Sequence, residues 1–306
     1  MPDVSDRSGK IDAPFGESPM SSGSQAALPI FWREAPCVRA AGEHAAGEQA
    51  LGDGGASGGR AVPLYLHGVP TNSDEWIEFL ARGGGIAPDL PGFGRSAKPG
   101  SLSFTIDEYA DFVEAFLDQR GVERVNLVVH DWGAVGLAFA QRHPQRIERV
   151  VVINAVPLLP GYRWHRTARI WRTPGLGELS MGVSSRRALR LLSREGNATP
   201  GPMPEQWLDT VLDHFDQGTQ RAILRLYRSS PPDVLAAAGA RLGEIGAPSL
   251  VVWGKRDPYI PARFAQAYAA ALGGAELLEL DDAGHWPWLD RPDVIDRVVE
   301  FVTASR

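Results

Sequence analysis

Short apolar runs alternate with longer amphipathic segments along the chain from Ala61 onward. This alternation is typical of βαβ units, in which buried parallel strands alternate with helices that cover the sheet. Strands are predicted at residues 29–33, 62–66, 85–87, 125–129, 150–153, 250–253 and 277–280. Helices are predicted from the apolar periodicity at residues 106–119, 136–142, 262–272 and 292–303. The pattern therefore predicts an α/β fold with a mostly parallel central sheet flanked by helices.

One long segment, residues 157–240, breaks this alternation. It is mostly helical in pattern, rich in arginine and aromatic residues, and contains no convincing strand. We expect it to form a helical cap inserted after the strand at 150–153, which divides the sheet domain into residues 29–156 and 241–306. Most of its aromatic side chains are expected to pack inside the cap, because a small subdomain needs bulky side chains to build a core.

The start of the chain differs in composition from the rest. Residues 1–28 are rich in Ser, Gly, Pro and Asp, and they lack the basic and apolar regions of a secretory signal. Such a composition rarely buries enough apolar area to become ordered, so it predicts a disordered tail. A short arm packed on the domain surface is the alternative. The Gly-rich stretch at residues 40–60 predicts a flexible loop.

The composition and net charge of the chain argue against some classes of binding partner. The chain has 306 residues, 43% of them hydrophobic, with a formal charge of -6 and a pI near 5.7. This balance gives no general reason to bind nucleic acid or an anionic membrane, and no apolar run approaches the roughly 20 residues that cross a bilayer. The single cysteine, Cys37, excludes an internal disulfide and suits a reducing compartment. We therefore expect a cytoplasmic protein without a nucleic-acid or membrane partner.

The strongest local motif is Leu127-Val128-Val129-His130-Asp131-Trp132-Gly133-Ala134. It predicts an apolar strand that passes through a tight turn into a helix, as in the nucleophile elbow, where the turn lifts one side chain clear of the sheet. Asp131 occupies the position that usually holds serine. The alternative is an aspartate that caps an ordinary helix.

Two later segments favour the catalytic interpretation. Asp257 follows the strand at 250–253, at the sheet edge where ligands bind in open α/β folds. His285 lies in a Gly-His loop after the strand at 277–280. The chain order of nucleophile, acid and histidine is that of the α/β-hydrolases. Three such segments in order, each after a strand, are a specific pattern.

A fourth segment, Leu66-His67-Gly68-Val69-Pro70, follows the strand at 62–66. We expect the backbone amides of Val69 and Trp132 to form an oxyanion hole. His67 is expected to be structural. His130 is expected to point away from the pocket, because neighbouring residues of a strand face opposite sides of the sheet.

Together these residues resemble the α/β-hydrolase superfamily, and within it the branch of epoxide hydrolases and haloalkane dehalogenases. The resemblance covers roughly residues 29–306, and its specific element is His-Asp-Trp-Gly at 130–133. It implies that Asp131 displaces a leaving group from an sp³ carbon and becomes an ester. His285, oriented by Asp257, would then activate the water that hydrolyses this ester. No metal or other cofactor is implied.

The leaving group separates the two branches. Epoxide hydrolases protonate the departing alkoxide with cap tyrosines, one of them in a Tyr-Arg pair, and Tyr227 fits that pattern. Tyr162 is the less certain second tyrosine, and packing inside the cap is the alternative role for Tyr227. A halide needs N–H donors instead, which Trp132 and one cap tryptophan, Trp164 or Trp171, would supply. The tyrosine favours an epoxide hydrolase narrowly, with a haloalkane dehalogenase as the alternative.

Other classes fit the sequence less well. An ester or C–C bond hydrolase on this scaffold normally needs serine at residue 131. A non-catalytic ligand-binding protein would have no need of an intact nucleophile, acid and histidine. The arginines of the cap are better explained by a solvated helical face than by nucleic-acid binding. We expect a small or medium hydrophobic substrate, water as the second reactant, and a monomer or homodimer.

Overall fold

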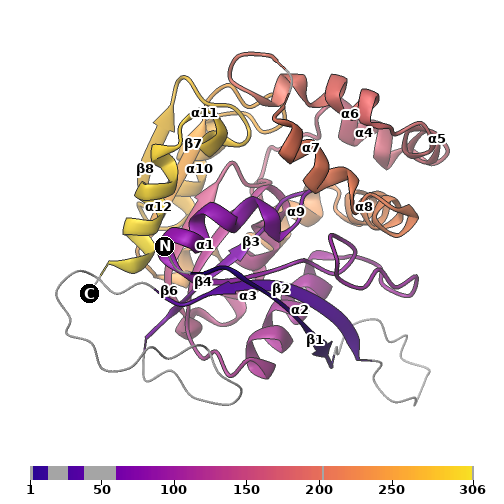
Figure 1. Cartoon of the computed structure of the whole chain (residues 1–306). Coiled ribbons are helices and arrows are strands. Elements are labelled where there is room, and N and C mark those ends of the chain that lie inside the picture. Colours follow the sequence, from indigo (N-terminus) through magenta and orange to yellow (C-terminus); the bar gives the residue numbers. More distant parts are fainter. Residues whose placement is uncertain (1–2, 13–26, 38–59, 202, 305–306) are drawn as a thin grey trace.

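A computed structural model describes residues 3–12, 27–37, 60–201 and 203–304 of the chain. An eight-stranded sheet crosses the molecule in the order β1-β2-β4-β3-β5-β6-β7-β8 (Figure 1). Strands β1 and β2 pair antiparallel to their neighbours, and all pairs from β4 to β8 are parallel. The strands are β1 (Ser5–Ile11), β2 (Leu28–Ala35), β3 (Val62–Leu66), β4 (Gly85–Pro88), β5 (Val125–His130), β6 (Ile147–Ile153), β7 (Ser249–Gly254) and β8 (Glu276–Leu280). The predicted mostly parallel sheet is confirmed.

Helices cover both faces of this sheet. On one face, α2 (Ile106–Gln119), α3 (Val135–Arg142) and α10 (Arg263–Ala271) pack on the same core as alternate strand residues. On the other face, α1 (Ile77–Gly83) and α12 (Asp293–Thr303) pack on the intervening residues. The central strands β3, β5 and β7 are buried along their whole length, as expected of parallel strands covered on both sides. The short helix α11 (Pro287–Asp290) follows the loop of His285.

The chain between β6 and β7 is helical. Its α-helices are α4 (Arg166–Arg172), α5 (Leu176–Gly182), α6 (Arg186–Leu192), α7 (Glu205–Leu212), α8 (Gln217–Ser229) and α9 (Pro232–Ala238). Figure 1 shows α4 to α8 gathered at one end of the sheet. Leu208 of α7 and Leu226 of α8 are fully buried in the same clusters as the sheet residues. The insertion is therefore packed onto the sheet domain, and its treatment as a separate cap domain stays a prediction.

The N-terminal segment differs from the predicted disordered tail. Residues 5–11 form β1, which pairs antiparallel with β2 over its whole length. A strand at a sheet edge is held by backbone hydrogen bonds, which its side-chain composition does not reveal. Ile11 is buried, and Gly9 lies against the ring of Trp32, where a Cβ atom would approach to 3.2 Å. Residues 13–26 and the Gly-rich stretch at 38–59 lie outside the described residues. No helix within the described ranges is long and apolar enough to span a bilayer.

Candidate active site

Asp131 lies at the sharp turn between β5 and α3. Its φ of 47° falls in the left-handed region, which a non-glycine residue adopts only when its surroundings hold it there. Two glycines make room for the turn. A Cβ atom on Gly68 would lie 2.7 Å from the Cβ of Asp131, and one on Gly133 would lie 2.1 Å from the carbonyl oxygen of Leu66. The strain and the close packing are those of a nucleophile elbow.

The structure brings Asp131, His285 and Asp257 together. His285 Nε2 lies 3.5 Å from Asp131 Oδ2, and His285 Nδ1 lies 2.7 Å from Asp257 Oδ2. All three side chains are buried. Because Asp257 accepts from Nδ1, the other ring nitrogen faces Asp131, which is the arrangement in which an imidazole transfers protons at a nucleophile.

Asp257 is held by a full set of hydrogen bonds. Its Oδ1 accepts from the backbone amides of Tyr259 and Ile260, at 2.7 and 3.0 Å. Its Oδ2 accepts from Asn154 Nδ2 at 2.7 Å as well as from His285. Asn154, which has a positive φ of 36°, was not predicted as a site residue. Its position directly after β6, at the same sheet edge as Asp257, is the signal by which it could have been found.

The charges of the site shift its pKa values in opposite directions. Burial by itself disfavours the imidazolium form of His285, but the Asp257 and Asp131 carboxylates outweigh it and raise the pKa of His285 to about 10. Burial likewise disfavours the Asp131 carboxylate, yet the hydrogen bond and charge of His285, aided by the Val69 amide, lower the pKa of Asp131. The free chain therefore holds Asp131 as an anion, the form required for nucleophilic attack.

The backbone amide of Val69 donates to Asp131 Oδ1 at 2.9 Å. The turn that presents this amide is fastened by Glu75, whose two oxygens accept from the Gly68 amide at 3.1 Å and from the Thr71 hydroxyl at 2.6 Å. The sequence did not predict a role for Glu75, because its polar surroundings are typical of a surface residue. An amide in this position can stabilise negative charge on Oδ1.

His67 was predicted to be structural and His130 to point away from the pocket, and both lie outside the cavity. His67 Nε2 accepts from the Leu90 amide at 2.9 Å, so its Nδ1 donates to the carbonyl of Gly68 at 2.7 Å. His130 is buried, with Nε2 3.0 Å from the carbonyl oxygen of His285 and Nδ1 3.3 Å from Glu75 Oε1. Both rings fix loops of the site, and neither lines the cavity.

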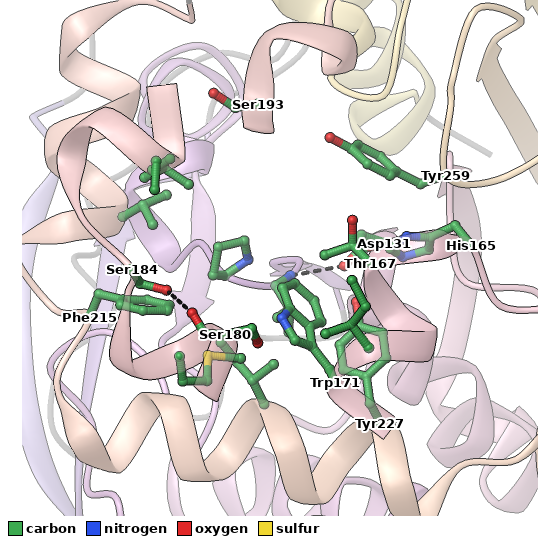
Figure 2. Close-up of a pocket in the computed structure, with 18 of the residues that line it drawn as sticks. Asp131, His165, Thr167, Trp171, Ser180, Ser184, Ser193, Phe215, Tyr227 and Tyr259 are labelled. Atoms are coloured by element: carbon green, nitrogen blue, oxygen red, sulfur yellow. Dashed lines mark hydrogen bonds between the residues drawn. The ribbon is translucent and has the colours of Figure 1, made fainter. Parts of the chain in front are cut away.

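A cavity of about 290 Å³ opens above Asp131 between the sheet edge and the insertion. Figure 2 shows Asp131 at its floor, with Trp171, Tyr227 and His165 around it. Most of the wall is apolar and includes Ile170, Met181, Leu189, Val211, Phe215 and Ile223. Such a cavity fits a hydrophobic organic molecule in contact with the carboxylate. Among the residues that the structure describes, no group of three His, Cys, Asp or Glu side chains has metal-binding geometry.

The comparisons with known proteins agree with this geometry. The model of the alpha/beta hydrolase family matches residues 64–298, which is most of the chain. The chain belongs to the alpha/beta hydrolase family. Within it, the chain is 30% identical over 278 residues to a haloalkane dehalogenase of Bradyrhizobium diazoefficiens, covering 78% of this chain and 85% of that protein. It is 28% identical to a haloalkane dehalogenase of Mesorhizobium japonicum, covering 81% and 85% respectively. These relatives place it in the dehalogenase and epoxide hydrolase branch.

Solved structures of this family share the fold. Haloalkane dehalogenase DbeA from Bradyrhizobium elkani matches with a TM-score of 0.74 at 23% identity, over 98% of both chains. A serine hydrolase from Cycloclasticus zankles matches with a TM-score of 0.71 at 19% identity, over 97% of this chain and 98% of that one. The α/β-hydrolase fold is confirmed, and the chain is a hydrolase of this family.

Two of the four side chains of the insertion that were predicted as hydrogen-bond donors line the cavity, and two do not. Tyr227 and Trp171 line the cavity, and their rings lie 5.0 Å apart. Trp164 instead donates its indole N–H to the carbonyl of Ser230 at 3.0 Å. Tyr162 donates to the carbonyl of Tyr259 at 3.4 Å. Neither Trp164 nor Tyr162 is among the residues that line the cavity, and both are buried. Of the expected second donors, only Trp171 is placed to contact a ligand.

Two further cavity residues were not predicted. Tyr259 lies two residues after Asp257, and its ring lies 5.1 Å from those of both His165 and His285. His165 caps α4, where its Nδ1 accepts from the Ala168 amide at 3.4 Å, so Nε2 carries the proton. Burial lowers the pKa of His165 to about 4, so the ring is neutral at physiological pH. His165 could not be predicted from the sequence, because a single histidine before a helix has no specific spacing to the other site residues.

Proposed function

We propose that this hydrolase cleaves a bond between an sp³ carbon and a leaving group through an ester on Asp131, and that it acts as a haloalkane dehalogenase. The observation that carries the proposal is the position of an aspartate, instead of a serine, at the elbow and 3.5 Å from His285. A carboxylate in that position can displace a halide. The names of the relatives support a dehalogenase better than the epoxide hydrolase expected from Tyr227.

The proposed reaction has two steps. Asp131 Oδ2 attacks the carbon that carries the halogen, the carbon–halogen bond breaks, and the halide departs with the bonding electrons. His285 then takes a proton from water, and the resulting hydroxide attacks the carboxyl carbon of Asp131. The negative charge that forms on Oδ1 is stabilised by the Val69 amide and, in this proposal, by the amide of Trp132. Collapse of this intermediate breaks the bond between the carboxyl carbon and the alkoxy oxygen, and His285 returns its proton to the departing alkoxide to give the alcohol. Loss of the remaining carboxyl proton to solvent restores the Asp131 carboxylate.

The Trp132 side chain supports halide as the leaving group. Its indole N–H is buried and has no acceptor at hydrogen-bond geometry. The same N–H lies near the Tyr227 hydroxyl, where it lowers the otherwise raised pKa of that tyrosine. Several other described tryptophans also have unpaired N–H groups, but Trp132 is the one that directly follows the nucleophile. Trp132 packs against Trp164 and Tyr227 and is not itself among the residues that line the cavity. In this proposal the departing halide reaches its indole N–H from the side of Asp131, and a hydrogen bond to a charged group contributes about 1.5–3 kcal/mol.

An epoxide hydrolase is the second candidate, because Tyr227 lines the cavity beside Asp131. Burial, followed by the negative charge of Asp131, raises the pKa of Tyr227 well above its ordinary value. The phenol therefore stays protonated and is able to donate to the alkoxide that an opening epoxide would form.

Two substitutions distinguish these candidates on a panel of bromoalkanes and epoxides. For a dehalogenase, Trp132→Phe is expected to lower halide release by about 10- to 100-fold through loss of one donor, whereas Tyr227→Phe leaves it nearly unchanged. Tyr109→Phe is the control, because Tyr109 donates to the carbonyl of Pro91 and does not line the cavity. Diol formation by the unmodified chain that falls by about 10² or more in Tyr227→Phe, without halide release, would replace the proposal by the second candidate.

The two steps are expected to differ in pH dependence. The pKa of Asp131 lies below its usual value, so the first step needs no deprotonation above about pH 5. The second step needs neutral His285. Esterification removes the Asp131 charge, which lowers the pKa of His285 from about 10, and hydrolysis then accelerates as the pH rises through that lowered value. Rapid quenching followed by mass spectrometry should find more ester at about pH 5 than at about pH 8. Equal ester fractions at both pH values would contradict this role of His285.

A further inference from the structure

Helices α4 to α6 carry the most exposed large apolar side chains of the described residues. Leu176, Leu179, Val183 and Leu191 are 54, 65, 65 and 69% exposed, whereas every other large apolar side chain is 39% exposed or less. Leu176, Leu179 and Val183 are spaced i, i+3 and i+7, so they lie on one face of α5 and its C-terminal cap. Contiguous exposure of this kind marks a surface that contacts something else.

The same helices carry a local positive charge. Residues 161–196 contain eight arginines and two glutamates, a formal charge of +6 in a chain whose total is -6. Several of these arginines are exposed and form no ion pair with any residue of the described ranges: Arg163, Arg166, Arg169, Arg187 and Arg194. The net negative charge of the whole chain therefore does not describe this region, which is basic and carries exposed apolar side chains. We call the exposed side of residues 161–196 the α4–α6 surface.

The α4–α6 surface adjoins the cavity. Figure 1 shows these helices at the outer end of the insertion, away from the sheet. Their inner sides line the cavity, through Ile170 of α4, Met181 of α5 and Leu189 of α6. A partner that covered the outer side would thus lie one helix away from the substrate.

The positive charge and the exposed apolar side chains of the α4–α6 surface together indicate which kind of partner it binds. A second copy of the chain would bring two surfaces of the same positive charge together, which opposes pairing. A nucleic acid would match the arginines but leave the leucines without a partner. We propose that the α4–α6 surface docks on a bilayer containing anionic lipid, with its arginines at the headgroups and its leucines among the upper acyl chains. A docked chain could take up hydrophobic substrate from that bilayer, and this consequence rests on the proposed function. The docking itself does not depend on the proposed function.

The test is sedimentation of the full chain with vesicles, which requires no turnover. The chain is expected to sediment with vesicles of phosphatidylglycerol and phosphatidylcholine and to remain in the supernatant with phosphatidylcholine alone. Raising the salt concentration should weaken binding, because it screens the arginines. Arg187→Glu should weaken binding about tenfold, and Leu179→Ser combined with Val183→Ser should abolish it. Leu277→Ser on β8, 36% exposed and remote from this surface, is the matched control that should bind normally.

Unchanged circular dichroism and thermal unfolding would show that the variants are folded, as expected for substitutions at exposed positions. The proposal is overturned if the chain ignores anionic vesicles, or if the Leu179→Ser and Val183→Ser variant binds them as the unmodified chain does. It is also overturned if gel filtration shows a dimer that this double substitution dissociates, since the surface would then seat a second copy. Vesicle binding by a chain that cleaves neither bromoalkanes nor epoxides would support the docking and reject only the proposed function.

Discussion

Asp131→Ala is expected to lower the rate of substrate cleavage by a factor on the order of 10⁴ or more, the usual effect of removing a covalent nucleophile. The reason is that the ester forms on the Asp131 carboxylate, which alanine lacks. Without the ester, there is no intermediate for His285 to hydrolyse. Halide or diol release from purified protein measures the effect. Asp281→Ala is a suitable control, since Asp281 is an exposed carboxylate whose partner, Lys255, is also on the surface.

Retention of more than about a tenth of the activity in Asp131→Ala would show that another group performs the chemistry. Absence of activity in both the unmodified chain and the variant, on every substrate of the panel, would instead favour a non-catalytic ligand-binding protein on the same fold. The two outcomes are distinguishable because the first requires turnover by the variant.

His285→Gln is expected to stop the reaction after its first step and to trap the ester. Asp131 can still attack, since its amide donor Val69 is unaffected, but no base remains to activate water. The protein should gain the mass of the alkyl group for a haloalkane, or of the whole epoxide for an epoxide. Intact mass spectrometry after incubation with substrate measures this gain, and peptide mapping should locate it at Asp131.

His143→Gln serves as the control for that experiment, because His143 is a partly exposed histidine paired with Glu114 and distant from the cavity. It should turn over substrate normally and show no added mass after quenching at neutral pH. If His285→Gln also shows no added mass while the unmodified chain is active, then the reaction does not pass through an ester of Asp131.

The position of the site followed from local patterns. The strands that end at Asp131 and Asp257 are continuous apolar runs, and each is followed by a polar turn, so their meeting at one sheet edge was predictable from parallel topology. His285 could be predicted for the same reason. Asn154 obeys the same rule at the end of β6 and went unrecognised, because a single asparagine has no specific spacing to a partner.

The donors around the cavity were not predictable to the same degree. Only Tyr227 stood out in sequence, through its Tyr-Arg pair, and nothing ranked Tyr162, Trp164 and Trp171. In the structure Tyr162 and Trp164 donate to backbone carbonyls, whereas Trp171 and Tyr227 line the cavity. That difference depends on how the short helices of the insertion rotate against the sheet domain. Helical periodicity defines a face but not the neighbour that the face meets.

The sequence by itself determined the fold class, the order of most strands along the chain and the candidates for nucleophile, acid and histidine. These are set by local hydrophobic periodicity and by turns whose residues are adjacent in the chain. Only the tertiary structure decided that residues 5–11 complete the sheet, that Trp164 donates to a backbone carbonyl while Trp171 and His165 line the cavity, and that Leu176, Leu179, Val183 and Leu191 stay exposed. Each of these depends on contacts between residues far apart in sequence, whose energies no local pattern records.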